Sequence, residues 1–152
     1  MPHFVAINKQ NFHIYRHQLL EIENLSFPSP WSLNAFQTEL DNKVSYIWAL
    51  EEKNSLIGYI CFWMFASEVQ IINIAVHPDR RKLKQGSSLL NRLVEKSRSN
   101  GIRNIWLEVR PSNQPARNLY TKTGFKEIGK RPQYYPDTKE DAILMALEIT
   151  YE

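Results

Sequence analysis

The chain lacks most of the features that define disulfide-rich, metal-binding or membrane-spanning proteins. Cys61 is the single cysteine, so no internal disulfide can form. The four histidines are scattered and neither CxxC nor HExxH occurs, so we expect no metal. The longest unbroken apolar run, residues 59–66, is far too short to cross a bilayer. The first residues lack the cationic start and apolar stretch of a signal peptide. A reducing, cytoplasmic location without membrane contact is therefore expected.

Several nucleotide and hydrolase motifs are also absent. The sequence contains no GxSxG, GxGxxG or GxxxxGK[ST], which leaves a hydrolase elbow, a dinucleotide fold and an NTPase loop without support. With 152 residues, 43% apolar and 23% charged, the composition is that of one globular domain spanning residues 1–152. The net charge of +3 mildly favours an anionic partner, such as a phosphate ligand or a ribonucleoprotein surface. It is too small to argue for direct nucleic-acid binding.

Hydrophobic periodicity divides the chain into strands and helices in the order β α α, three strands, then α β α β β. Strands are predicted at residues 4–7, 45–50, 56–65, 68–76, 104–109, 126–130 and 142–149, and helices at 12–24, 32–40, 86–100 and 115–124. This order predicts an α+β fold with a mixed, mostly antiparallel sheet. The crossover helix at 86–100 makes the strands at 71–76 and 104–109 parallel. Open sheets bind ligands beyond the carboxyl ends of such strands.

The segment from Ile71 to Asn100 is typical of a phosphate cradle. An apolar strand leads through a basic loop that ends at Gly86, and a helix with leucines at helical spacing follows. The first N–H groups of a helix lack internal partners, and the helix dipole adds partial positive charge at that end. The segment therefore predicts a phosphorylated ligand. The alternative is an ordinary strand–loop–helix with a solvated basic turn.

Two residues could carry proton transfer. Glu108 lies beside Trp106 on a predicted strand, and partial desolvation there would raise its pKa toward that of a general base. The alternative is a surface glutamate paired with Arg110. Tyr120 is a phenol that could protonate a leaving thiolate, or a core aromatic residue that packs with Leu119 and Phe125. Three further features have plain structural interpretations: Asn113 as a helix cap, Tyr134-Tyr135-Pro136 as a packed turn, and Cys61 as a buried apolar residue.

Taken together and in order, the motifs resemble those of the GNAT N-acetyltransferases, which use acetyl-CoA. The matching segments are Phe27-Pro28-Ser29-Pro30-Trp31-Ser32, Asn73-Ile74-Ala75-Val76-His77-Pro78, Trp106-Leu107-Glu108-Val109-Arg110 with Ser112-Asn113, Leu119-Tyr120 with Gly124-Phe125, and Tyr134-Tyr135-Pro136 followed by Glu140-Asp141-Ala142-Ile143 and Met145. They cover about four fifths of the chain. Within the family they are similar to members that acetylate the N-terminal alanine of a small-subunit ribosomal protein. The resemblance implies a seven-stranded sheet with helices on both faces and a splayed parallel strand pair.

The resemblance also implies a role for individual residues. Glu108 would accept the proton and Tyr120 would donate one. The cofactor would be bound by Ile74, Ala75 and Val76 along the pantetheine arm, by Lys82, Leu83, Lys84, Gln85, Gly86 and Ser87 around the pyrophosphate, and by Asn113. Phe27, Trp31, Tyr134 and Tyr135 would wall the slot for the N-terminus of the acceptor protein.

The loop departs from the family pattern at one position. The family reads R/Q-x-x-G-x-G/A, whereas here Lys84 replaces the first glycine. If that position needs a positive φ, lysine costs on the order of 1 kcal/mol. The backbone N–H groups remain, and the ammonium attracts phosphate, so we predict that cofactor binding survives.

Other functions stay open at the level of sequence. The enzyme could acetylate a small amine such as a polyamine or a drug, or the chain could bind acetyl-CoA without catalysis. Nucleic-acid binding through the basic loop is the least favoured, because its charges are more simply used on the cofactor. No sequence feature fixes the oligomeric state, and a monomer or weak dimer is expected.

Overall fold

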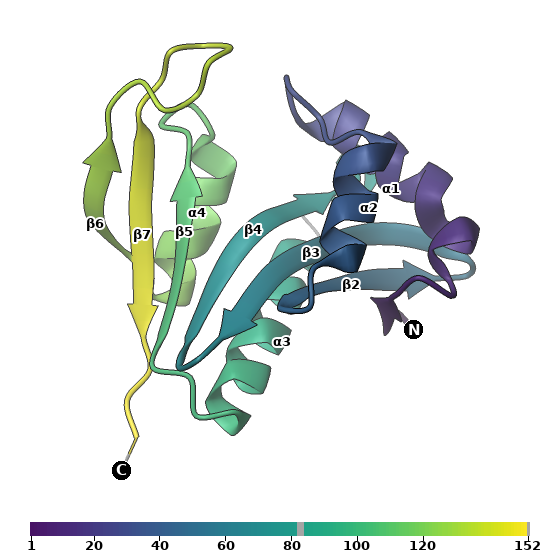
Figure 1. Ribbon diagram of the computed structural model, residues 1–152, viewed down its shortest axis with the longest axis horizontal. Helices are drawn as coiled ribbons and strands as arrows, with labels where there is room; N and C mark the ends of the chain where they lie inside the picture. Colours follow the sequence, from purple (N-terminus) through teal and green to yellow (C-terminus); the bar gives the residue numbers. More distant parts are fainter. Residues whose placement is uncertain (82–83, 152) are drawn as a thin grey trace.

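The computed structural model describes residues 1–81 and 84–151, and within them seven strands form one mixed sheet (Figure 1). The strands are β1 (His3–Ile7), β2 (Ser45–Glu52), β3 (Ser55–Phe65), β4 (Glu68–Val76), β5 (Asn104–Val109), β6 (Lys126–Arg131) and β7 (Ala142–Glu148). They lie in the order β1-β2-β3-β4-β5-β7-β6. Every neighbouring pair is antiparallel except β4 and β5, which are parallel as predicted.

The helices cover both faces of the sheet. They are α1 (Phe12–Ser26), α2 (Leu33–Asp41), α3 (Gln85–Ser99) and α4 (Gln114–Thr123), with a short 3-10 helix η1 (Pro78–Arg80) after β4. Helices α1 and α2 lie on one face of the sheet, and α3 and α4 lie on the other (Figure 1). No helix among the described residues combines the length and apolar composition that crossing a bilayer requires.

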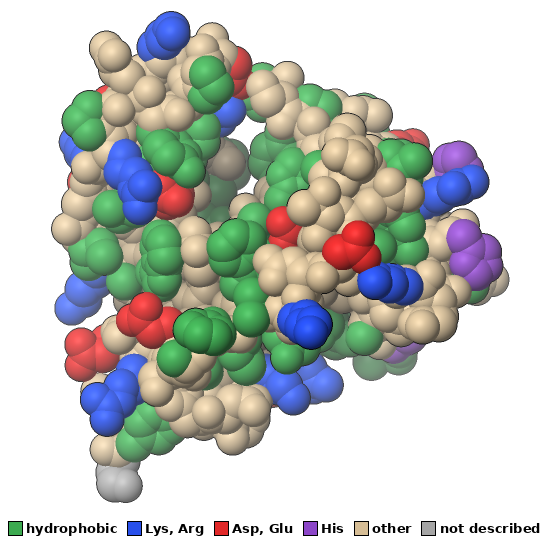
Figure 2. Space-filling model, viewed as in Figure 1, with side chains coloured by type: hydrophobic (Ala, Val, Ile, Leu, Met, Phe, Trp, Pro, Cys, Tyr) green, Lys and Arg blue, Asp and Glu red, His purple; other side chains and the backbone are tan. Residues whose placement is uncertain are grey.

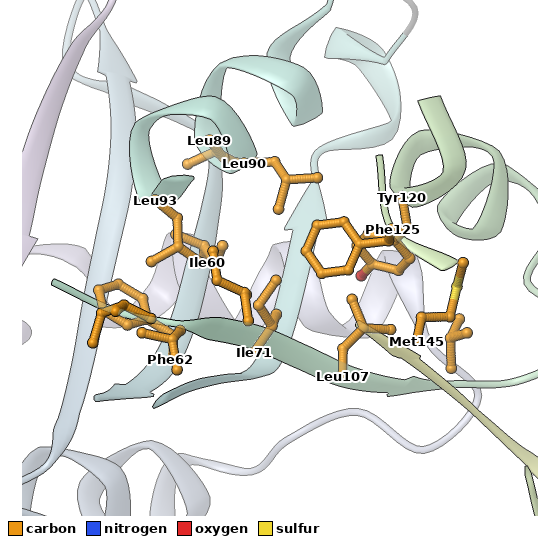
Figure 3. Close-up of a cluster of buried hydrophobic side chains, with 14 of the residues drawn as sticks. Ile60, Phe62, Ile71, Leu89, Leu90, Leu93, Leu107, Tyr120, Phe125 and Met145 are labelled. Atoms are coloured by element: carbon orange, nitrogen blue, oxygen red, sulfur yellow. The ribbon is translucent and has the colours of Figure 1, made fainter. Parts of the chain in front are cut away.

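Two apolar clusters hold these layers together. Leu19, Ile22 and Phe36 of α1 and α2 pack with Tyr59 on one face of the sheet. On the other face, the leucines of α3 pack with β3, β4 and β5, and Tyr120 and Phe125 lie beside Leu107 and Met145 in the same cluster (Figure 3). The inner strand β3 is buried over most of its length, because both clusters cover it.

The parallel strands β4 and β5 separate halfway along their length. Their pairing runs from Glu68 opposite Asn104 to Ile71 opposite Leu107 and then stops. At the same point Ile72 is the extra residue of a β-bulge against β3, since Phe62 pairs with Ile71 and Cys61 with Asn73. A bulge bends its strand and increases the local twist. It therefore turns the second half of β4 away from β5, and the sheet opens into a V (Figure 1).

The predicted fold is confirmed, and most element boundaries differ from the prediction by one or two residues. Ser32 caps α2 by accepting a hydrogen bond from Ala35 N–H at 3.2 Å. Gly124 ends α4 at a φ of 115°, in the left-handed region that favours glycine. These local signals are strong because each rests on a few neighbouring residues.

Candidate active site

A cavity of about 410 Å³ lies in the opening between β4 and β5. The segment between α1 and α2 and the loop between β6 and β7 form its two outer walls, and the surface is visibly hollowed between the two halves of the molecule (Figure 2). Its lining residues include Glu23, Phe27, Ser29, Trp31, Ile72, Asn73, Ile74, Glu108, Arg110, Asn113, Tyr120, Tyr135 and Glu140. The cavity thus joins the parallel-strand opening to segments that lie far apart in the sequence.

Glu108 points into this cavity from β5. Its strand alternates between buried and partly exposed residues, with Leu107 and Val109 on the core side, as the sequence predicted. The side chain of Glu108 is only 13% exposed, and its Oε2 makes no hydrogen bond among the described residues. Arg131 Nε lies 3.3 Å from that oxygen. Glu108 is therefore a largely buried carboxylate at the cavity, and the alternative pairing with Arg110 is wrong, because Arg110 binds Asp137 instead.

Tyr120 is both a core residue and a cavity residue. Its ring on α4 packs against Phe125 at a centroid distance of 5.7 Å, and the residue is only 5% exposed. It also lines the cavity. Burial raises the pKa of its phenol above the ordinary value, and the nearby Tyr135 adds to the shift. The phenol therefore stays protonated and remains able to donate.

Three of the four aromatic residues that were expected to wall the acceptor slot line the cavity. Phe27 and Trp31 line the cavity from the segment between α1 and α2, and Tyr135 lines it from the loop between β6 and β7. Burial raises the pKa of Tyr135 to about 12, with Glu108 contributing. Tyr134 is not among the lining residues: it is 46% exposed and its ring packs edge-on against Tyr135. In this structure Tyr134 therefore supports the wall through Tyr135.

A polar bridge joins these two outer walls. Ser29 Oγ donates a hydrogen bond of 2.7 Å to Asp137 Oδ2, and the two terminal nitrogens of the Arg110 guanidinium donate to Asp137 at 2.8 and 2.9 Å. The guanidinium also lies 4.0 Å from the centre of the Tyr135 ring. Arg110 and Ser29 together hold the pKa of Asp137 well below its usual range. The bridge thus ties the two outer walls together across the cavity.

Glu23 is a site residue that the sequence interpretation missed. It is fully buried on α1 and accepts hydrogen bonds from Trp31 N–H at 2.7 Å, Asn73 Nδ2 at 2.8 Å and the Tyr59 hydroxyl. Burial raises its pKa, and the three hydrogen bonds oppose that shift. The signal was present, because Glu23 follows Leu19 by four positions and so shares the apolar face of the helix.

The second half of β4 supplies the backbone groups expected to bind the pantetheine arm. Ile74 lines the cavity, whereas Ala75 is 6% exposed and, like Val76, is not among the lining residues. Ile74 N–H donates to Asn73 Oδ1 at 3.1 Å, and Val76 O accepts from Arg81 Nε at 2.9 Å. Both backbone groups are therefore held by polar side chains near the opening.

The basic loop ends at the amino terminus of α3. Lys84 is the N-cap residue of the helix, with φ 63° and ψ 22°. The position that is glycine in the family pattern therefore has the left-handed conformation, which favours glycine. The first helical bond joins Ser88 N–H to Lys84 O, which leaves Gln85, Gly86 and Ser87 in the first turn, where N–H groups lack intrahelical acceptors. Lys82 and Leu83 lie outside the described residues.

Two further residues, Gly86 and Asn113, were expected to contact the cofactor. A Cβ at Gly86 would lie 3.1 Å from Leu119 Cδ2, so glycine allows the start of α3 to approach α4 closely. Asn113 caps α4 by accepting from Ala116 N–H at 3.3 Å, as predicted, and it also lines the cavity. The described residues hold no group of three or more His, Cys, Asp or Glu side chains placed to bind a metal ion.

Comparison with known proteins agrees with this geometry. Residues 16–125 match the family described as the acetyltransferase (GNAT) family. An Escherichia coli (strain K12) protein named [Ribosomal protein bS18]-alanine N-acetyltransferase is 35% identical over 132 residues, which are 85% of this chain and 88% of that protein. The crystal structure of the ribosomal-protein-S18-alanine N-acetyltransferase from Escherichia coli superposes with a TM-score of 0.87 at 30% identity, covering 100% of this chain and 96% of the other.

A more distant structure shares the fold alone. The crystal structure of the NatC complex bound to Gag peptide and CoA matches with a TM-score of 0.82 at 21% identity, covering 98% of this chain and 99% of that chain. The matched family, the identity to the Escherichia coli protein and the splayed sheet agree. This chain therefore belongs to the GNAT family of acetyltransferases.

Proposed function

We propose that this chain transfers the acetyl group of acetyl-CoA to the N-terminal amine of a protein, and that the acceptor is the N-terminal alanine of a small-subunit ribosomal protein. One observation carries the chemistry: Glu108 and Tyr120 line the same cavity, from β5 and α4, beside the open half of β4. A base and an acid beside one opening match the two proton transfers that aminolysis of a thioester requires.

The residues divide the work as follows. Bound acetyl-CoA supplies an activated acyl group. The first turn of α3 offers N–H groups to the pyrophosphate, and Ile74 and its neighbours on β4 lie along the pantetheine arm. Glu108, directly or through water, removes the proton from the attacking nitrogen. Tyr120 gives its proton to the departing thiolate, and its burial keeps that proton available.

The energetics of the amine favour a chain terminus over a lysine. An α-amine has a pKa near 8, so its neutral form at pH 7 costs only about 1.4 kcal/mol. A lysine amine with a pKa near 10.4 costs about 4.6 kcal/mol. A single carboxylate base is better suited to the first task. The aromatic walls formed by Phe27, Trp31 and Tyr135 suit an extended peptide that enters by its end.

The identity of the acceptor is inferred from the relatives. The Escherichia coli protein that is 35% identical is named for the alanine of ribosomal protein bS18. The Escherichia coli crystal structure shares the overall fold of this chain, with a TM-score of 0.87. These likenesses favour a ribosomal peptide that begins with alanine.

The test is an acetyl-CoA assay on a peptide panel. Peptides that differ in their first two residues, including an alanine-initiated ribosomal peptide, are compared for thiol release and for acetylation at the α-nitrogen by mass spectrometry. An N-terminally blocked peptide with an internal lysine and a set of polyamines serve as controls. We expect the alanine-initiated peptide to be preferred. Transfer only to polyamines would identify a small-amine acetyltransferase, and cofactor binding without transfer to any amine would contradict catalysis.

A further inference from the structure

Glu23 lies where the acceptor wall meets the cofactor strand. Its Oε1 accepts from Trp31 N–H, which belongs to the wall segment between α1 and α2. Its Oε2 accepts from Asn73 Nδ2, which belongs to β4 beside the bulge at Ile72. The Tyr59 hydroxyl of β3 also donates to Oε2. The carboxylate of Glu23 on α1 therefore contacts the wall segment, β3 and β4.

The connection continues through Asn73 to the backbone of β4. The Asn73 amide nitrogen donates to Glu23, and its Oδ1 accepts from Ile74 N–H at 3.1 Å. Ile74 lines the cavity on the side where the pantetheine arm is proposed to lie. A continuous series of hydrogen bonds thus runs from Trp31 through Glu23 and Asn73 to Ile74.

We propose that Glu23 is a positioning residue that fixes the acceptor wall at Trp31 relative to the cofactor strand at Ile74. The assignment rests on the proposed function, because only that function makes these segments the two sides of a reaction. Glu23 acts through Trp31 and Asn73 and is not assigned contact with the reacting atoms. The proposed base remains Glu108, whose Oε2 lies 3.3 Å from Arg131 Nε.

The hydrogen-bonding pattern requires a carboxylate at this position. Trp31 N–H and Asn73 Nδ2 can only donate, and one of them faces each oxygen of Glu23. Glutamine offers one oxygen and one NH₂ group, so it can satisfy only one of these two donors. If Asn73 turned over to accept from the new NH₂, its own nitrogen would face Ile74 N–H. Every arrangement of glutamine therefore disturbs the wall, the strand or both.

Glu23→Gln tests the proposal in the full-length chain, with Glu39→Gln as the matched control. Glu39 is also a helix glutamate with protein partners, but Trp63 Nε1 and Ser45 Oγ both donate to its Oε1, at 2.7 and 2.8 Å. One glutamine oxygen can replace that acceptor, and Glu39 does not line the cavity. Four quantities are measured: the hydrogen-exchange rate of the Trp31 backbone amide, the Kd of acetyl-CoA, and both kcat and KM for the alanine-initiated peptide.

We expect Glu23→Gln to speed exchange of the Trp31 amide about tenfold and to raise the acceptor KM or the acetyl-CoA Kd by about tenfold or more. Glu39→Gln is expected to keep all four quantities within about twofold of wild type. Values like wild type for the exchange rate, the KM and the Kd of Glu23→Gln would overturn the proposal. A loss confined to kcat would also overturn it, because that result would assign Glu23 to the proton transfer itself.

Asn73→Ala provides a second arm if Glu23→Gln does not fold. It removes the link to Ile74 and leaves Trp31 bound to Glu23, so the Kd of acetyl-CoA should rise several-fold while Trp31 exchange stays slow. An unchanged Kd would contradict the link. Exchange and Kd need no turnover, so they decide this inference even if wild-type protein acetylates no peptide, the result that would refute the proposed function separately.

Discussion

Arg131 Nε lies 3.3 Å from Oε2 of Glu108, although strand β7 runs between the two strands that carry them. Register explains the reach. Glu108 is opposite Leu144 of β7, and Leu144 is opposite Gly129 of β6. Gly129 carries no side chain, so Arg131, two residues further along β6, can extend across that row. The ion pair gives the buried carboxylate a cation on one oxygen.

The first prediction concerns this ion pair. Arg131→Met should lower kcat about two- to tenfold, because Glu108 loses the group that orients it, while the acceptor KM and the Kd of acetyl-CoA stay unchanged. Arg131→Lys should recover part of the loss. Arg131 is half exposed, so the fold should tolerate both changes. Lys130→Met, on the same strand and exposed, is the control. Equal kcat values for Arg131→Met and wild type would separate the ion pair from catalysis.

The second prediction concerns Glu108 itself. Glu108→Gln keeps the shape of the side chain but removes its capacity to accept a proton, so turnover should fall by about 10²–10⁴-fold. Binding of acetyl-CoA, measured by calorimetry, should be unaffected. Glu127→Gln, an exposed carboxylate on β6, should retain full turnover. Unchanged turnover in Glu108→Gln would remove this residue from the mechanism.

The elements of the fold could be predicted because their signals are local. The apolar run before His77 and the alternation from Ile105 to Val109 are visible within a few residues, and the crossover helix between them forces the strands to be parallel. The cap at Asn113 follows from the same short-range chemistry. The left-handed conformation at Lys84 was expected only from the glycine of the family pattern, because a lysine gives no local signal for it. The bulge at Ile72 could not be predicted, because it depends on how β3 pairs with β4.

The partners of the site residues could not be predicted, because they depend on register between distant strands. The sequence suggested that Arg110 would neutralise Glu108, its neighbour on the same face of β5. In the structure Arg110 binds Asp137, 27 positions later, and Arg131 pairs with Glu108. The two tyrosines of the acceptor loop were likewise equivalent in sequence, and only the fold places Tyr135 inward and Tyr134 outward.

The third prediction concerns the phenol of Tyr120. Tyr120→Phe keeps the ring that packs on Phe125, so thermal stability should change little, whereas turnover should fall at least tenfold as the thiolate loses its proton donor. Because burial raises the pKa of Tyr120 above its ordinary value near 10, the phenol keeps its proton throughout pH 7–10. Loss of this proton should therefore cause no alkaline fall in kcat below about pH 10.

The control for that experiment is Tyr46→Phe, a 44% exposed tyrosine stacked on Phe62 outside the cavity. It should leave kcat and its pH profile unchanged. If Tyr120→Phe turned over as fast as wild type, the thiolate would have to take its proton from another group.

The fourth prediction concerns backbone strain at Lys84. Lys84 has a positive φ of 63°, a conformation that costs a lysine on the order of 1 kcal/mol. Glycine adopts this conformation without that strain, so Lys84→Gly should raise the Tm by about 2–4 °C. The Kd of acetyl-CoA should stay within about tenfold of wild type, roughly 1.4 kcal/mol. Lys53→Gly, at a φ of 51° in the turn between β2 and β3, should raise the Tm similarly without changing the Kd. A larger gain in cofactor affinity for Lys84→Gly would show that the natural loop is defective.

The final prediction concerns the bridge between the two outer walls of the cavity. Ser29 Oγ donates to Asp137, so Ser29→Ala should free the wall segments from each other and raise the acceptor KM about three- to tenfold. The Kd of acetyl-CoA should not change, because the bridge lies on the side of the cavity proposed for the acceptor. Ser67→Ala, in the exposed turn between β3 and β4, is the control.

The same bridge has a definite pH dependence. Arg110 and Ser29 depress the pKa of Asp137 in the folded protein, so the stabilising contact is fully present above the unfolded value near 3.9 and is lost only as the pH falls through the lower folded value. The acceptor KM should therefore show no contribution from Asp137 between pH 5 and 9. Asp137→Asn removes the charge that binds Arg110 and should raise the KM more than Ser29→Ala at every pH in that range. A KM for Ser29→Ala equal to that of wild type would mean that the walls are held by their own packing, and the bridge would then have no part in acceptor binding.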